Sequence, residues 1–210
     1  MHQIVIALHH YAAGQDGRFP PAALYDQGGR PLLSWRVLIL PYLEQEPLYQ
    51  EFRFDEPWDS PHNAALLPRM PKVYSVPDRL PVGVGAERSD TFIQVFVGPG
   101  AAFEGSRGLS PSGGDFPDGL SSTLLLAEAR EAVPWTKPVD LAYEPDQPLP
   151  PLGGVFTGRG RFSLFGPNRS PGFHVALGDG SVRFVGPQVS EATLRAAITR
   201  NGGDRLGDDW

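Results

Sequence analysis

The sequence contains no cysteine. Disulfide bonds, thiolate catalysis and cysteine-ligated zinc are therefore excluded. No run of apolar residues approaches the roughly 18 that a membrane-spanning helix needs. The opening residues, MHQIVIALHHY, contain no basic stretch followed by an apolar one. We therefore expect no signal peptide in the chain as given.

Positive charge is also scarce. The 210 residues carry 18 Lys and Arg against 24 Asp and Glu, a net charge of −6, and no segment concentrates the basic residues. A phosphate-binding surface is not indicated, so nucleic acid is not an expected partner. Hydrophobic residues make up 40% of the chain, enough for a single domain with its own core. The 25 glycines and 23 prolines predict a loop-rich fold with short elements.

No motif for catalysis or metal binding stands out. No serine lies in a Gly-x-Ser-x-Gly elbow. His9 and His10 are adjacent and His2 is seven residues from His9, whereas a helical zinc pair needs i, i+4 spacing. A group of carboxylates on polar segments is typical of solvated surfaces: Glu44, Glu46, Glu51, Asp55, Glu56 and Asp59. We expect no enzymatic activity, no cofactor and no metal.

Helices are predicted at both ends of the chain. Ile4, Leu8 and Tyr11 fall on one face of a helix that Gly14 is placed to end. In the tail, Ser190 is a predicted N-cap for a helix whose apolar stripe and stop are Leu194, Ala197, Ile198, Asn201 and Gly202.

Shorter elements lie between these helices. Ser34 is a predicted cap for a helix that Pro41 is expected to break or kink, unless Pro41 begins a second helix in its own first turn. Ser60 is a predicted cap for a helix over residues 61–69. Apolar and β-branched runs predict strands over 72–76, 91–97, 122–128, 173–177 and 181–185.

The sharpest pattern is FHVALGDGSVRFV, residues 173–185. Asp179 and Gly180 fit the centre of a two-residue type I′ turn. Counting outward pairs Leu177 with Val182 and Val175 with Phe184, which predicts one shared apolar face and leaves His174 on the other. The turn explains Asp179 structurally; the alternative is a calcium ligand or an acid.

Tryptophans offer a second alternative. A proline-rich segment from Trp135 onward is too apolar for a free linker and is expected to wrap across the domain. The four tryptophans could line a glycan or peptide groove, or pack in the core with only the last one exposed: Trp35, Trp58, Trp135 and Trp210.

Several unusual stretches occur in a fixed order: QIVIALHHYAAGQDGRFPPAA, LLSWRVLILPYLEQEPLYQEF, EPWDSPHN, MPKVY, VFVGPGAAFE, AVPWTKPVDL and GDGSVRF. Together they resemble the bacterial domain of unknown function 1559 family over essentially the whole chain. The resemblance marks a set of structural motif residues: Trp35, Pro41, Trp58, Asp59, Trp135, Asp179 and Gly180. Where the family places a histidine ten residues before Asp179, this chain has Arg169.

The resemblance implies a relative of type IV pilins and type II secretion pseudopilins. It implies an α+β, pilin-like fold, with the N-terminal amphipathic helix packed on an antiparallel sheet, loop-rich insertions and a short C-terminal helix. Residues 1–210 would be one such domain without its leader and membrane half-helix.

The expected function is non-enzymatic: a structural or assembly protein on the extracytoplasmic face of the cell envelope. Its expected partners are other protein subunits, and it would meet the membrane only through the missing helix. The alternative is an extracytoplasmic domain that binds glycan or peptide.

Overall fold

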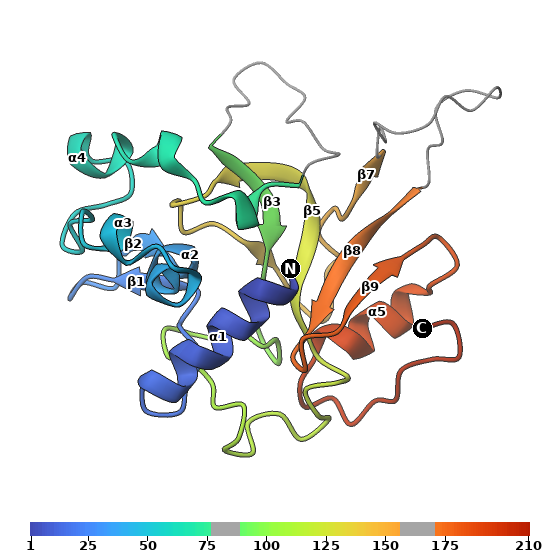
Figure 1. The fold of residues 1–210 in the computed structure, drawn as a ribbon. Helices are drawn as coiled ribbons and strands as arrows, with labels where there is room; N and C mark the ends of the chain where they lie inside the picture. Colours follow the sequence, from blue (N-terminus) through green and yellow to red (C-terminus); the bar gives the residue numbers. More distant parts are fainter. Residues whose placement is uncertain (77–88, 156–170) are drawn as a thin grey trace, which may run out of the picture.

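The computed structural model describes residues 1–76, 89–155 and 171–210. The predicted α+β class is confirmed. A central antiparallel sheet has the strand order β3-β5-β8-β7, and β9 also pairs with β8, off this path (Figure 1). Its strands are β3 (Asp90–Gln94), β5 (Leu124–Pro134), β7 (Gly154–Val155), β8 (Pro171–Leu177) and β9 (Val182–Val185).

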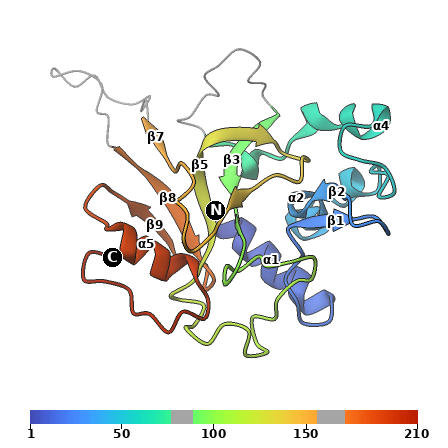
Figure 2. The ribbon, with the colours of Figure 1, turned by 180° about the vertical axis from the view of Figure 1, so that it is seen from behind.

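Helices cover both faces of this sheet. Helix α1 (His2–Gly14) lies on the face seen in Figure 1, and α5 (Glu191–Ile198) lies on the face seen in Figure 2. The remaining elements are short: β1 (Ala23–Tyr25), β2 (Pro31–Ser34), α2 (Trp35–Leu38), η1 (Leu40–Leu43), α3 (Glu46–Tyr49), α4 (Pro61–Ala64), η2 (Leu67–Arg69), η3 (Lys72–Tyr74), β4 (Phe96–Val97) and β6 (Leu141–Ala142).

Helix α1 turns its apolar side toward the sheet, as the sequence predicted. Ile4, Val5 and Leu8 are at most 1% exposed and share a core with Leu126 and Ala176 of β5 and β8. Burial of such side chains is worth about 1.5–3 kcal/mol each. No helix in the described part of the chain combines the length and apolarity needed to cross a membrane.

Two histidines fasten α1 to the tip of the β8–β9 hairpin. His2 Nδ1 lies 2.8 Å from the Gly180 carbonyl oxygen, and His9 Nε2 lies 2.7 Å from the Gly178 carbonyl oxygen. Each ring nitrogen must carry a proton to donate to its carbonyl. The seven-residue spacing that does not suit a zinc ion thus serves two carbonyls.

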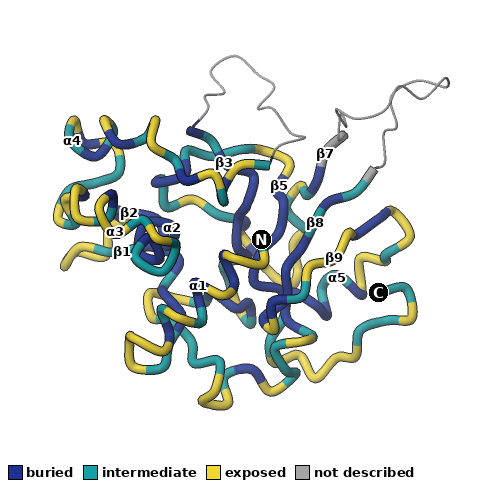
Figure 3. The backbone as a smooth tube through the Cα atoms, in the orientation of Figure 1, coloured by how far each residue is buried: buried dark blue, intermediate teal, exposed yellow. Residues whose placement is uncertain are grey.

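Three consecutive leucines in β5 are all buried. A register shift between Leu124 and Leu126 places Leu124 opposite Leu177 and Leu126 opposite Ala176. Leu124 therefore packs in the core on the α5 side, whereas Leu126 packs in the core on the α1 side. β5 and β8 run through the most buried part of the molecule (Figure 3).

The β8–β9 hairpin forms, but the predicted register is wrong by one residue. The Gly180 amide donates to the Leu177 carbonyl at 3.0 Å, and the Leu177 amide donates to the Ser181 carbonyl at 2.9 Å. Gly180 alone takes positive φ, at +88°, whereas a type I′ turn would require it of Asp179 as well. The loop is therefore a three-residue connection ending in a glycine bulge.

The slip reverses the faces of β9. Val182 now lies opposite Ala176 and Phe184 opposite His174. Val182 and Phe184 are 43% and 45% exposed instead of buried, and Val185 enters the core in their place.

A prediction tests the left-handed position in this loop. Gly180→Ala is expected to lower the free energy of unfolding by about 1–2 kcal/mol. The reason is that a residue with a Cβ is sterically strained in the left-handed backbone conformation that Gly180 adopts. That Cβ would also lie 3.3 Å from His2 Nδ1. Gly29→Ala is the matched control for the backbone effect alone. Gly29 also has a positive φ, +80°, but nothing lies within 4 Å of its Cβ position. Urea titration gives both values, and an unchanged Gly180→Ala variant would contradict the assigned loop.

Other strands and helices differ from expectation. Residues 72–76 do not form a strand: η3 forms instead, because the Tyr74 amide donates to the Pro71 carbonyl oxygen at 3.0 Å. The helix predicted over 61–69 breaks into α4 and η2, where Pro68 cannot donate a backbone hydrogen bond. The predicted 91–97 strand divides at Val95, and 122–128 begins at Leu124 and runs on to Pro134.

The three predicted serine caps are confirmed. Ser34 accepts the Arg36 amide, Ser60 the Asn63 amide and Ser190 the Thr193 amide. Pro41 lies in the first turn of η1, directly after α2 ends, as its missing amide requires.

Candidate functional site

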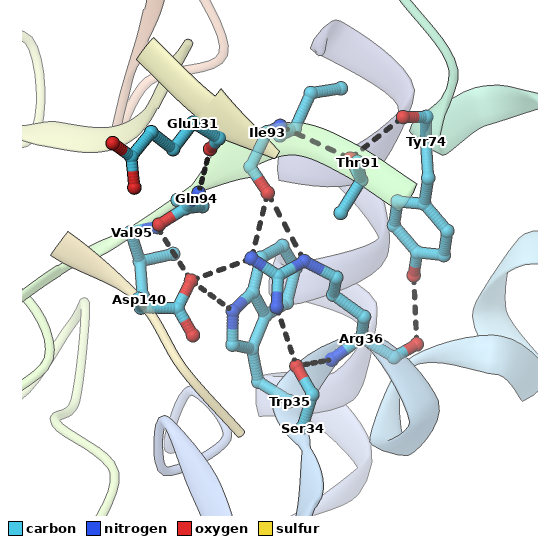
Figure 4. Close-up of polar contacts among 10 residues, drawn as sticks. All are labelled: Ser34, Trp35, Arg36, Tyr74, Thr91, Ile93, Gln94, Val95, Glu131 and Asp140. Carbon is cyan, nitrogen blue, oxygen red and sulfur yellow. Dashed lines mark hydrogen bonds and ion pairs between the residues drawn. The ribbon is translucent and has the colours of Figure 1, made fainter. Parts of the chain in front are cut away.

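A buried ion pair links α2 to the segment between β5 and β6. Arg36 Nη2 donates to Asp140 Oδ1 at 2.6 Å, and the two side chains are 0% and 2% exposed (Figure 4). The residues are 104 positions apart. The Ser34 cap helps to position the guanidinium, because Ser34 Oγ accepts both the Arg36 amide and Arg36 Nη1.

Arg36 also hydrogen-bonds to the backbone on the outer edge of β3. Its Nε and Nη2 donate to the Ile93 carbonyl at 3.1 and 2.7 Å. Tyr74 donates its hydroxyl to the Arg36 carbonyl, and Thr91 Oγ1 donates to the Tyr74 carbonyl, each at 2.8 Å. Side chains thus satisfy an edge that would otherwise need another strand (Figure 4).

The two oxygens of Asp140 have different surroundings. Oδ1 accepts from Arg36, from the Val95 amide at 3.0 Å and from Trp35 Nε1 at 3.3 Å. Within the described residues, Oδ2 has no hydrogen-bond donor, and Figure 4 shows it turned away from Arg36. Burial raises the pKa of Asp140, while the Arg36 charge and the donors to Oδ1 act in the opposite direction.

Asp140 also lines a pocket of about 300 Å³ at the meeting of β1, β4 and β6. Apart from the Tyr25 hydroxyl and Asp140, the side chains that line it are apolar: Ala22, Ala23, Val97, Pro138, Val139 and Ala142. The Val139 side chain is 42% exposed.

A larger groove of about 620 Å³ runs between α1 and the segments around η1 and η3. Gln3, Ile6 and His10 of α1 form one wall, and Tyr42 and Val73 lie on the other. Charged groups line it as well, including Arg69, which forms an ion pair with Glu51. Ile6 is 41% exposed.

The residues that the sequence marked as structural motifs do not gather in one place. Trp35 and Trp135 are fully buried, Trp58 and Pro41 are half-buried, and Asp59 is exposed. Buried as they are, Trp35 and Trp135 do not line an open groove. Trp210, expected to be exposed, is half-buried: it packs against the core on the α5 side, and the Arg183 guanidinium lies 5.6 Å from its ring.

Asp179 is used by its own turn. Its Oδ1 accepts from the Ser181 amide at 2.9 Å and from the Ser181 hydroxyl at 2.7 Å. The pKa of Asp179 is lowered overall: burial, the largest single effect, raises it, but the hydrogen bonds from Ser181 and the nearby Arg183 charge contribute to a larger combined lowering. Across the described residues, no three His, Asp or Glu side chains lie close enough to hold a metal ion. Arg169 lies outside the described residues.

Sequence reasoning missed Arg36 and Asp140 as partners. One signal was available: Arg36 is the only charged residue in the largely apolar run LLSWRVLIL. An arginine in such a run has to be buried with a counter-charge, but nothing local to Asp140 identifies the partner.

Comparison with known families places the first half of the chain. The family described as "Protein of unknown function (DUF1559)" matches residues 1–110. The chain belongs to this family. The match to DUF1559 spans α1, Arg36 and both walls of the larger groove, whereas Trp135, Asp140 and the β8–β9 hairpin lie beyond it. Searches of curated proteins and of solved structures gave no match.

Proposed function

We propose that this protein is a non-catalytic structural subunit of a cell-envelope assembly, related to the pseudopilins, that contacts other subunits through α1. The single supporting observation is the seating of α1. Helix α1 lies along an antiparallel sheet with its apolar side buried. A separate row of its side chains faces outward.

The inner side of α1 is rigidly held. It is fixed by the core around Ile4 and Leu8 and by two histidine hydrogen bonds to the hairpin. A helix anchored in this way keeps a fixed orientation relative to the sheet, because it cannot rotate without exposing apolar surface. That is the property a stalk needs when its outer side meets a neighbouring subunit.

The outer side of α1 has suitable chemistry for such a contact. Ile6 stands exposed at the edge of the 620 Å³ groove, where Gln3 and His10 offer polar groups beside it. An apolar side chain surrounded by hydrogen-bonding groups is typical of the centre and rim of a protein interface. The expected partner is a further copy of this subunit.

Cross-linking between copies tests this function. The natural chain has no cysteine, so an Ile6→Cys variant carries a single thiol. Two differently tagged full-length copies would be expressed together in the native bacterium and treated with a bismaleimide. We expect products containing both tags, at least about fivefold more abundant than for a control thiol at Asp146, an exposed residue.

Asp146 is a suitable control because it lies in the segment held by α5, on the other face of the sheet. The neighbouring Pro145 carbonyl accepts from Arg195 Nη1 at 2.9 Å. Equal yields from the two positions would contradict an assembly built through α1.

A further inference from the structure

We propose that the pocket beside Asp140 is a binding site for a neutral hydroxyl or amide N–H group carried on a small apolar body. This site goes beyond the subunit contact of α1 and does not depend on it. It is formed by β1, β4, β6 and the segment before β6.

The first argument is the unused oxygen. Asp140 is 2% exposed at its side chain, and all three of its donors from the described residues converge on Oδ1. A carboxylate has about four acceptor positions, and the donors from the described residues leave those of Oδ2 to solvent. Oδ2 faces away from Arg36, and Asp140 lines the pocket, so a ligand donor there would replace solvent on a charged acceptor that no described donor occupies.

The second argument concerns charge. Arg36 already balances the Asp140 carboxylate at 2.6 Å, so the pair presents no net charge to the pocket. A second cation would lose its hydration and would be repelled by the guanidinium. A neutral O–H or N–H group loses far less on entering, and its hydrogen bond to a charged acceptor is stronger than one between neutral groups.

The third argument concerns the body of the ligand. Alanine, valine and proline side chains supply most of the walls, with the Tyr25 ring at one side. At about 300 Å³, the space lies at the lower end of the range for small-molecule sites. A single ring or a short branched chain fits this volume and this lining.

Two sources could supply such a group: a free small molecule, or a side chain such as tyrosine from a neighbouring subunit. Both present the same chemistry to Oδ2. The Val139 side chain, 42% exposed at the pocket, would contact either one.

Phenol and fluorobenzene make a matched pair of probes, because they are similar in size and only phenol donates a hydrogen bond. Each would be titrated into the full chain and followed by the amide resonances of Ala23, Val97 and Ala142. We expect phenol to shift these signals with an affinity at least about tenfold higher than that of fluorobenzene, the effect of one hydrogen bond to a charged acceptor. Equal affinities, or no shifts at these positions, would overturn the proposal.

A blocked pocket supplies the control. Asp140→Asn could unfold the protein, so the variant of choice is Ala142→Phe, which places a ring at an exposed position of the pocket. Ala192→Phe, at an exposed position of α5, is its match. We expect the first variant to abolish the phenol shifts and the second to retain them; retention in both would overturn the assignment.

The same variants separate the two sources. If the ligand is a neighbour's side chain, adding Ala142→Phe to Ile6→Cys lowers the yield of cross-linked copies by at least about threefold. If the ligand is a free molecule, that yield is unchanged. Failure of the α1 contact is visible separately, as loss of the cross-link in Ile6→Cys alone.

Discussion

Replacing Arg36 with methionine is expected to lower the free energy of unfolding by about 3–5 kcal/mol. Methionine fills much of the same volume but donates nothing. Asp140 would remain buried without its counter-charge, and the Ile93 carbonyl would lose both of its side-chain donors. Urea titration followed by circular dichroism measures the loss.

Arg53→Met is the matched control. Arg53 also pairs with a carboxylate, Glu56 at 2.9 Å, but its side chain is 57% exposed. An exposed pair contributes about 0–1 kcal/mol, so little change is expected. A double variant, Arg36→Met with Asp140→Leu, should recover part of the loss because no unpaired charge remains. The assigned role is refuted if Arg36→Met costs no more than Arg53→Met.

The elements predicted well from sequence are those whose signals are local. Ser34, Ser60 and Ser190 each accept an amide two or three residues away, and that chemistry can be read from a short window. Helix α1 was predictable for the same reason. Its apolar stripe repeats with the helical period over thirteen residues.

The hairpin shows where a local signal is insufficient. Asp179 and Gly180 suit a two-residue turn and also a three-residue loop with glycine at its end. The apolar alternation of Val182 and Phe184 favoured the first loop, whose register would bury both. The structure adopts the second and exposes both, while Arg183 contacts Trp210 from the tail. That contact is distant in sequence.

The Arg36–Asp140 network likewise joins residues that are far apart in the sequence. Its members come from α2, η3, β3 and the segment before β6, so no spacing rule connects them. The run around Arg36 indicates burial of a charge, but only the fold identifies Asp140 as its partner. The pocket that Asp140 lines is harder still to predict from the sequence, because it exists only once β1 lies near β6.

Trp135→Ala is expected to lower the free energy of unfolding by about 3–5 kcal/mol, which for a chain of this size corresponds to a fall in Tm of about 10 °C. Trp135 is fully buried, its ring stacks on Tyr74 at 5.9 Å, and the edge of Phe52 meets it at 5.8 Å. Alanine would leave a cavity between these rings. It would also remove the donor to the Leu67 carbonyl, 3.0 Å from Trp135 Nε1.

Two further variants separate the cavity from the hydrogen bond. Trp135→Phe keeps part of the ring packing and loses the donor, so about half of the alanine effect is expected. Trp58→Ala is the control, because Trp58 is half-buried with Lys137 over its ring at 5.4 Å, and a loss of about 1–2 kcal/mol is expected. Circular dichroism should follow all three, since tryptophan fluorescence itself changes. Equal losses for Trp58→Ala and Trp135→Ala would mean that Trp135 does not join the end of β5 to η2 and η3 as the packing indicates.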